Sequence, residues 1–190
     1  EWKPPSLHTL SETPLNLPTT STLPALPAGA VIEALDADLL VFVDGHHIAD
    51  LSQVGVLPEG VTLSNLADHW QEAGQDKNTA LADLNQATAG DGLYLDIADG
   101  VTLERPIHLL CIAKTDNALL PLRHSIRLGR NANATLIEHY LHSGDEPVYY
   151  RNVVLDIDLA DGANLNHTRL QNESSQAWHT SLLQANLSRD

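Results

Sequence analysis

Cysteine and basic residues are scarce in this chain of 190 residues, and each scarcity excludes a class of protein. The one cysteine, Cys111, cannot form a disulfide bond within the chain. Lysine and arginine together number 10 against 25 aspartates and glutamates, which gives a net charge of −15. A surface this acidic repels nucleic-acid phosphates and anionic lipid headgroups, so we expect neither a nucleic acid nor a membrane as a partner.

Long apolar runs and several nucleotide or hydrolase motifs are also missing. No apolar stretch reaches the roughly 18 residues that a membrane-spanning helix needs. The chain has no glycine-rich phosphate loop ending in Gly-Lys-Ser/Thr and no Gly-x-Ser-x-Gly elbow. Cys111 lies in the apolar run 107–113, which predicts a buried strand and a packing role for the thiol. Apolar residues nevertheless make up 43% of the chain, a globular composition.

What the sequence does contain is a seven-residue motif that recurs five times and is called the phrase below. It reads Leu or Ile, two residues, Gly or Asn, Ala or Val, one residue, and an apolar residue. Its copies are 26–32, 57–63, 97–103, 128–134 and 159–165. Their turn positions, Gly29, Gly60, Gly100, Asn131 and Gly162, are 31, 40, 31 and 31 residues apart. A fixed interval of this size is typical of a repeat fold, in which each unit packs on its neighbours. We expect the residues one and three places after the turn to point inward.

The first 90 residues predict a mixed region. Six prolines within residues 1–30 predict an extended connector that sustains no helix. Next we expect a strand over 39–43, a tight turn at Asp44–Gly45 and a return strand over 46–48. Two helices follow, one capped by Ser64 and running through Leu66, Ala67 and Trp70, the other running from about Asn78 through Leu81 and Leu84 to Ala87 and ending near Gly90. These helices account for the single interval of 40 residues.

After Gly92 helical periodicity disappears and short strands are predicted in quick succession. They are 93–97, 107–113, 122–128, 135–141, 148–159, 165–170 and 178–187. In the longest of these, Val153, Leu155 and Ile157 alternate with Asp156 and Asp158, which predicts one apolar and one mostly acidic, solvated face.

Two architectures fit these strands, an antiparallel sandwich and a parallel β-solenoid. The repeated phrase favours the solenoid, because a sandwich has no reason to reuse one corner at a fixed interval. We therefore expect a mainly β protein in two parts. Residues 1–90 form the connector and a small α/β region, and residues 91–190 form the first part of a right-handed parallel β-helix.

Ten histidines and several acidic residues invite a search for chemistry. His46, His47, His108, His124, His139, His142, His167 and His179 are the candidate ligands, but they lack the spacing of a zinc site. His139 and His142 fall on opposite faces of the predicted strand. Asp156, Asp158 and Glu138 could serve a carbohydrate-cleaving β-helix, but such pairs arise easily in an acidic chain. We assign no catalytic, cofactor-binding or metal-binding residue.

Several stretches together resemble one family. They are Glu1–Lys3, Leu40–Gly45, Pro106–Leu110, Arg123–His124, Ala132–His139 and Leu170–Ser174 with Ala177 and His179. In this order and spacing they are similar to the SufB/SufD family of iron–sulfur cluster assembly proteins, particularly its SufD branch. The resemblance departs at Pro4–Pro5, where the family usually carries an aromatic and a small polar residue.

The resemblance implies a right-handed parallel β-helix and a non-enzymatic cytoplasmic scaffold that pairs with SufB and is driven by the ATPase SufC. In the family the SufC-docking helices and the SufB–SufD interface lie in the C-terminal part, so no functional residue is carried over. An iron–sulfur cluster is implied only for the full complex, and no cofactor for this part of it.

Leu187–Asp190 repeats the first four places of the phrase, which indicates a chain cut within a repeat. Two other functions stay open at this point. One is a carbohydrate-active or polysaccharide-binding β-helix protein that uses acidic residues and Ca²⁺, and the other is a structural solenoid that assembles with itself.

Overall fold

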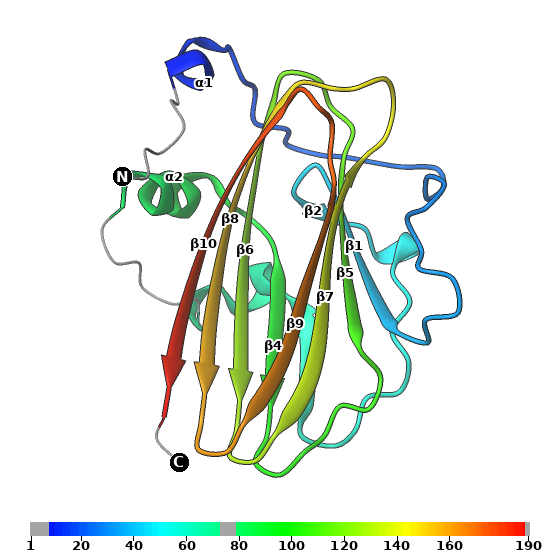
Figure 1. Cartoon of the computed structure of the whole chain (residues 1–190), viewed down its shortest axis with the longest axis vertical. Coiled ribbons are helices and arrows are strands. Elements are labelled where there is room, and N and C mark those ends of the chain that lie inside the picture. The colour runs from blue at the N-terminus through cyan, green and yellow to red at the C-terminus, as the bar shows by residue number, and fades with distance from the viewer. Residues whose placement is uncertain (1–7, 73–78, 189–190) are drawn as a thin grey trace, which may run out of the picture.

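The computed structural model describes residues 8–72 and 79–188, and its dominant feature is a pair of five-stranded sheets (Figure 1). One sheet has the strand order β2-β1-β5-β7-β9 and the other β10-β8-β6-β4-β3. The strands are β1 (Asp38–Val43), β2 (His46–His47), β3 (Val61–Asn65), β4 (Leu93–Ile97), β5 (Ile107–Ala113), β6 (Ala118–Leu128), β7 (Asn133–His142), β8 (Tyr149–Leu159), β9 (Asn164–Asn172) and β10 (Ala177–Leu187). The helical elements are α1 (His8–Glu12), η1 (Ala49–Leu51), η2 (Leu66–Glu72) and α2 (Ala80–Thr88).

From β4 onward the chain winds as a solenoid. Each successive strand crosses to the other sheet, and each pairs in parallel with the strand two places later in the chain. Three coils result: coil 1 is β4–β5, coil 2 is β6–β7 and coil 3 is β8–β9, after which β10 continues the sheet of β4, β6 and β8. The predicted β-solenoid after a small α/β region is confirmed, and the strands predicted from residue 93 onward are all present.

The repeated phrase forms the corners of this solenoid. All five of its turn positions have positive φ, with values of 73° at Gly100, 55° at Asn131 and 68° at Gly162. Glycine adopts this conformation without steric cost, and asparagine tolerates it better than most residues. The next inward residues, among them Leu103, Ala132 and Ala134, join the main core as predicted. The first two copies differ in place: Gly29 lies in the segment before β1, and Gly60 precedes β3, which pairs antiparallel with β4.

Replacing Gly100 with alanine tests the corner conformation separately from packing. A Cβ at Gly100 meets no atom within 4 Å, so the cost is that of a left-handed backbone alone. We expect the free energy of unfolding, measured by urea titration, to fall by about 1–2 kcal/mol. Gly90→Ala is the matched control, because Gly90 also has open space around it but no positive φ. An equal response of the two variants would contradict the role of the corner.

The main core fills the space between the two sheets. It contains inward residues from every coil, such as Leu95, Leu109, Leu136 and Leu155, all fully buried. A second cluster lies on the outer face of the sheet that holds β1, β5 and β7, where Leu23, Leu26 and Ala30 of the N-terminal segment cover Val41 and Leu110. The segment that the prolines predict to be extended thus serves as a cover for one sheet.

The N-terminal region joins the solenoid through its strands. β1 extends one sheet in parallel with β5, and β3 extends the other antiparallel to β4. The predicted turn between β1 and β2 is confirmed, with φ of 50° at Asp44 and 85° at Gly45. The buried Asp44 carboxylate accepts hydrogen bonds from the backbone of Lys114 and Thr115 and from the Ser21 hydroxyl, which ties the hairpin to coil 1 and the N-terminal segment. The division of the chain near residue 90 stays a prediction.

Two local predictions are wrong. A short helix, α1, forms at His8–Glu12 within the predicted connector, because the stretch between Pro5 and Pro14 contains no proline. Ser64 belongs to β3 and caps nothing. Instead the Asn65 side chain accepts a hydrogen bond from the Asp68 backbone, and the helix that follows, η2, is a 3₁₀ helix. The second helix, α2, is confirmed with Thr79 as its cap, whereas the predicted start at Asn78 lies outside the described residues.

The predicted acidic face of β8 is also wrong in part. Asp158 is exposed, but Asp156 is only 8% exposed and forms an ion pair with Arg123 at 2.8 Å. The outer face of this sheet is partly covered, because α2 packs on β6 and β8. Burial and pairing, rather than solvation, therefore hold the Asp156 carboxylate.

Asn85 fixes α2 to the sheet. Its side-chain amide donates hydrogen bonds to the backbone carbonyls of Leu122 and Asn152, both at 3.0 Å, and the Asn152 side chain donates in return to the Leu81 carbonyl. We expect Asn85→Ala to lower the free energy of unfolding by about 1–3 kcal/mol, because buried carbonyls lose a donor. Urea denaturation measures this. The exposed neighbour Gln86 provides the control, since Gln86→Ala removes no such bond and should cost nothing. Equal losses would refute the role of Asn85.

Candidate functional site

The inside of the solenoid holds an ionic cluster at the level of coils 2 and 3. We call it the lumen cluster. It consists of two carboxylates, two arginines, three histidines and a tyrosine: Glu138, Glu173, Arg151, Arg169, His124, His167, His179 and Tyr140. Strand alternation directs these side chains inward, because they occupy the same faces as Leu136, Val153 and Leu165 of the main core.

Glu138 is the centre of the first half of the lumen cluster. Its carboxylate has no exposed surface and accepts a hydrogen bond from Arg169 Nε at 2.6 Å, while His167 Nε2 lies 3.4 Å away. Burial pushes the pKa of Glu138 upward. The contact with His167 and the charge and hydrogen bond of Arg169 outweigh this and lower the pKa to about 2. Glu138 is therefore an anion held chiefly by Arg169 and His167.

Arg151 and Glu173 form the second half. The guanidinium of Arg151 is fully buried and donates from Nε to Glu173 at 2.8 Å, and His179 Nδ1 lies 2.6 Å from the same carboxylate. Burial raises the pKa of Glu173, but hydrogen bonding to His179 and the charge of Arg151 lower it to about 2. The ring of Tyr140 joins the two halves, because Arg151 and Arg169 both lie over it, at 5.1 and 5.7 Å from its centroid.

His124 faces the lumen as a neutral ring. Its Nδ1 accepts a hydrogen bond from the Leu93 backbone N–H at 2.9 Å, so the ring proton lies on Nε2. Full burial lowers the pKa of His124 to about 4. A neutral histidine coordinates a metal only through a nitrogen without a proton, so the Leu93 bond makes His124 a poor metal ligand. Within the described ranges, no group of three or more His, Cys, Asp or Glu residues is arranged to hold a metal ion.

Several buried polar atoms of the lumen cluster have no hydrogen-bond partner among the described residues. They are Glu138 Oε1, Tyr140 Oη, Arg151 Nη1, His124 Nε2, His167 Nε2 and His179 Nε2. Native structures leave few such atoms, and each needs an explanation, such as a functional role or an ordered water. The lumen is therefore a polar interior in which several hydrogen-bond donors and acceptors have no partner among the described residues.

The other candidate histidines have separate structural roles. His46 bonds to the Pro18 carbonyl and His47 to the Ser52 hydroxyl. His108 and His139 stack on the outer face of the sheet, with ring centroids 5.5 Å apart. His142 lies on the other face from His139, as predicted, 3.7 Å from Glu146. Of the candidate histidines in the described part of the chain, His124, His167 and His179 belong to the lumen cluster.

Cys111 and the acidic candidates also have defined places. Cys111 is buried in β5, and burial raises the pKa of its thiol to about 12, which confirms the packing role. Glu138 lies inside the solenoid, whereas Asp156 and Asp158 lie on the outer face of β8. The three carboxylates therefore do not converge, and Asp156 is already paired with Arg123.

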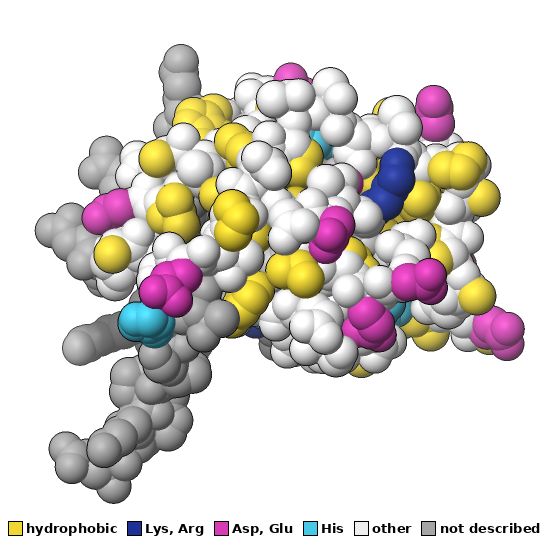
Figure 2. All heavy atoms as spheres, turned by 90° about the horizontal axis from the view of Figure 1, so that it is seen from above, with side chains coloured by type: hydrophobic (Ala, Val, Ile, Leu, Met, Phe, Trp, Pro, Cys, Tyr) yellow, Lys and Arg dark blue, Asp and Glu magenta, His cyan; other side chains and the backbone are white. Residues whose placement is uncertain are grey.

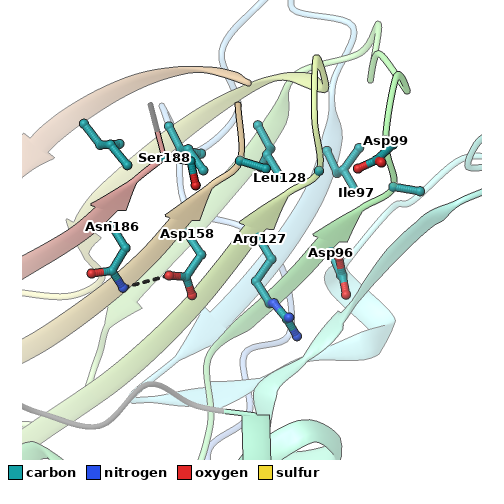
Figure 3. Close-up of a pocket in the computed structure, with 13 residues that line it drawn as sticks. Asp96, Ile97, Asp99, Arg127, Leu128, Asp158, Asn186 and Ser188 are labelled. Carbon is teal, nitrogen blue, oxygen red and sulfur yellow. Dashed lines mark hydrogen bonds between the residues drawn. The ribbon is translucent and has the colours of Figure 1, made fainter. Parts of the chain in front are cut away.

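An outer groove of about 430 Å³ runs across the ends of β4, β6, β8 and β10. Figure 3 shows its polar side chains as a row across neighbouring strands, Asp96, Arg127, Asp158 and Asn186, with the Asn186 amide donating to Asp158 at 2.7 Å. The row is a consequence of the 31-residue interval, because Asp96, Arg127 and Asp158 stand in register.

The surface as a whole is acidic. Five arginines are used in ion pairs: Arg105, Arg123, Arg130, Arg151 and Arg169. At the end of the solenoid seen in Figure 2, acidic side chains are spread among neutral and hydrophobic ones, and cationic groups are sparse. Within residues 8–72 and 79–188, no helix has the length and apolar character to span a membrane.

The lumen cluster is the functional candidate that reasoning from the sequence missed. The sequence contains a sign of it, because Glu138 and Arg169 lie 31 residues apart and so occupy equivalent positions in successive coils. Inward positions were identified only from the phrase itself, and the charged residues farther along each strand were not followed across the repeat.

These features define a parallel β-solenoid with an ionic lumen, and comparison with known proteins adds a family to which the chain is similar. Residues 111–190 match the family model described as SUF system FeS cluster assembly, SufBD core domain. The iron–sulfur cluster assembly SufBD family protein slr0076 of Synechocystis sp. is 31% identical over 159 residues, which cover 74% of this chain and 35% of that protein. Residues 111–190 are therefore similar to the SufBD core domain, and the chain spans about a third of the length of the curated relative that it matches.

Proposed function

We propose that this chain is part of a scaffold subunit for iron–sulfur cluster assembly, acting in the cytoplasm with SufB and the ATPase SufC. The observation that carries the proposal is the SufBD core domain match over coils 2 and 3, supported by the family name of the cyanobacterial relative. The lumen cluster supports a role that is not catalytic for this half of the solenoid, since its carboxylates are held as ion pairs by arginine and histidine.

The proposal is tested by affinity purification of the full-length gene product from its own cells. We expect SufB and SufC to be retained at near-equal amounts, and the purified assembly to accept an iron–sulfur cluster when iron and sulfide are supplied. Deleting the gene should lower the activity of iron–sulfur enzymes in the cell. Retention of neither SufB nor SufC, together with unchanged iron–sulfur enzyme activity, would refute the proposal.

The carbohydrate alternative has less support. Cleavage of a glycosidic bond uses two carboxyl groups that flank it, one as the acid and one as the base or nucleophile, and neither can be held in an ion pair. Here Asp156 is paired with Arg123 and bonded by Gln184, and Asp158 is bonded by Asn186. Assays on acidic polysaccharides with and without Ca²⁺ distinguish this alternative. Turnover that disappears in Asp158→Asn would favour it over the scaffold.

A further inference from the structure

The three solenoid corners carry charges whose sign alternates from coil to coil. The corner of coil 1 reads Asp-Ile-Ala-Asp-Gly over 96–100, that of coil 2 reads Arg-Leu-Gly-Arg-Asn over 127–131, and that of coil 3 reads Asp-Leu-Ala-Asp-Gly over 158–162. Both charged places change sign together. In the sequence the next copy carries Arg189 at the second of these places, outside the described residues.

The fold stacks these charges in two rows. The sheet row is Asp96, Arg127 and Asp158, three residues in direct register on the outer face (Figure 3). The corner row is Asp99, Arg130 and Asp161. Arg130 donates from Nε and Nη2 to Asp99 at 2.9 and 2.7 Å, and its backbone N–H donates to the same carboxylate at 2.8 Å. The charge of Asp161 acts on Arg130 from the other side.

The backbone of the corners is alike in the three coils, because Gly100, Asn131 and Gly162 share one conformation and each is followed by a small apolar residue that packs on the same core. The side chains differ at one place: coil 2 has Gly129 where coils 1 and 3 have Ala98 and Ala160, and a Cβ at Gly129 would lie 2.6 Å from the Asp99 backbone nitrogen. Close packing at this one place favours coil 2 as the neighbour of coil 1, and a pairing of coil 1 with coil 3 is opposed by charge as well. Such a pairing would set Asp96 against Asp158 and Asp99 against Asp161, and like charges on neighbouring strands destabilise a sheet.

We propose that the alternating corner charges are a register lock, which makes each coil stack on its sequence neighbour and disfavours a stack that skips a coil. The two rows act by repulsion in the wrong arrangement more than by attraction in the right one, since exposed ion pairs contribute little. The lock accounts for the polar row of the outer groove as an element of folding specificity.

Cross-linking of the full chain during refolding tests the lock. Thr102, Asn133 and Asn164 form a column across the coils, with Thr102 paired to Asn133 and Asn133 to Asn164. In T102C/N164C a disulfide forms only when coil 1 meets coil 3, whereas N133C/N164C reports the native stack. Every variant also carries Cys111→Ala, because this free thiol is buried only in the folded chain. The variant R127D/R130D/D158R/D161R makes the corners of coils 1 and 2 negative and that of coil 3 positive, so that coil 1 attracts coil 3.

We expect this variant to raise the 102–164 cross-link by about two- to fivefold over the native charges and to lower the refolding yield. The variant D96R/D99R/R127D/R130D/D158R/D161R inverts every charge but keeps the alternation, and should refold as the native chain does. Salt at about 1 M shortens the range of these charges and should reduce the difference. Equal cross-linking in all charge patterns, or an inverted chain as defective as the reordered one, would overturn the proposal.

Discussion

Replacing Glu138 with glutamine is expected to lower the free energy of unfolding by about 3–5 kcal/mol, the cost of breaking a buried ion pair. The side chain keeps its size but loses the charge that holds Arg169 at 2.6 Å and His167 at 3.4 Å. Two basic groups then face a lumen that also contains Arg151 and His124, without the Glu138 anion to balance them. Urea unfolding followed by circular dichroism measures the loss.

The exposed pair of Asp99 and Arg130 provides the control. It has comparable geometry, with an Nη2–Oδ2 distance of 2.7 Å, but both side chains are more than half exposed, at 54% and 69%. Asp99→Asn should therefore leave the unfolding midpoint where it is, because water replaces the lost partner. If Glu138→Gln were as mild as Asp99→Asn, the lumen cluster would contribute no stability through its charges.

A double replacement separates the cost of a lone charge from the value of the pair. Glu138→Leu together with Arg169→Leu removes both charges and leaves apolar side chains beside Leu109 and Leu136 of the core. Buried ion pairs are often replaced by apolar residues at no cost, so we expect this double variant to recover most of the stability lost in Glu138→Gln. A double variant less stable than Glu138→Gln would mean that the pair itself stabilises the solenoid.

The solenoid was predictable because its signal is repeated. A glycine or asparagine in left-handed conformation, followed by inward apolar residues, recurs at 31-residue intervals through Gly100, Asn131 and Gly162, and the interval outweighs chance similarity. The N-terminal region has no such repetition. Its elements are set by tertiary contacts that the local sequence does not specify, such as the pairing of β3 with β4 and the bonds of Asn85 to β6 and β8.

The lumen cluster was not predictable from residue types. Glu138, Arg151 and Arg169 look like surface residues, because charged side chains are almost never fully buried unless paired. Their pairing depends on how the coils stack: Glu138 meets Arg169 on the neighbouring strand of the same sheet, whereas Arg151 of β8 meets Glu173, which follows β9 of the other sheet. Asp156 shows the same effect on the outer face, where Arg123 of the neighbouring strand turns an expected solvated carboxylate into a buried one.

Acid is expected to destabilise this protein in two stages that follow from its buried histidines and carboxylates. Burial, with the neighbouring His139, lowers the pKa of His108 to about 4, and burial lowers that of His124 to about 4, both from 6.5. As the pH falls from about 6.5 to 4, the unfolded chain binds protons that the folded chain does not, so stability falls by about 1.4 kcal/mol per pH unit for each histidine.

The second stage belongs to Glu138 and Glu173. Their pKa values are lowered from 4.5 to about 2, so the stability they contribute is complete above about pH 4.5 and is lost as the pH falls toward 2. Over its own pH range, each of the four groups changes the free energy of unfolding by on the order of 3 kcal/mol. Urea midpoints measured between about pH 7.5 and pH 3 should therefore decline throughout, with no plateau near pH 5.

Two variants assign the stages. His124→Gln keeps an acceptor for the Leu93 backbone N–H but has no titrating ring, so the decline between about pH 6.5 and 4 should become shallower while that below pH 4 is unchanged. Glu138→Gln should do the reverse, weakening the dependence only below about pH 4.5. The two groups interact, since ionised Glu138 favours the protonated form of His124, and protonation of Glu138 removes this favourable charge. A stability that stays flat from about pH 7 to 4 would show that the buried histidines are not held neutral by the fold.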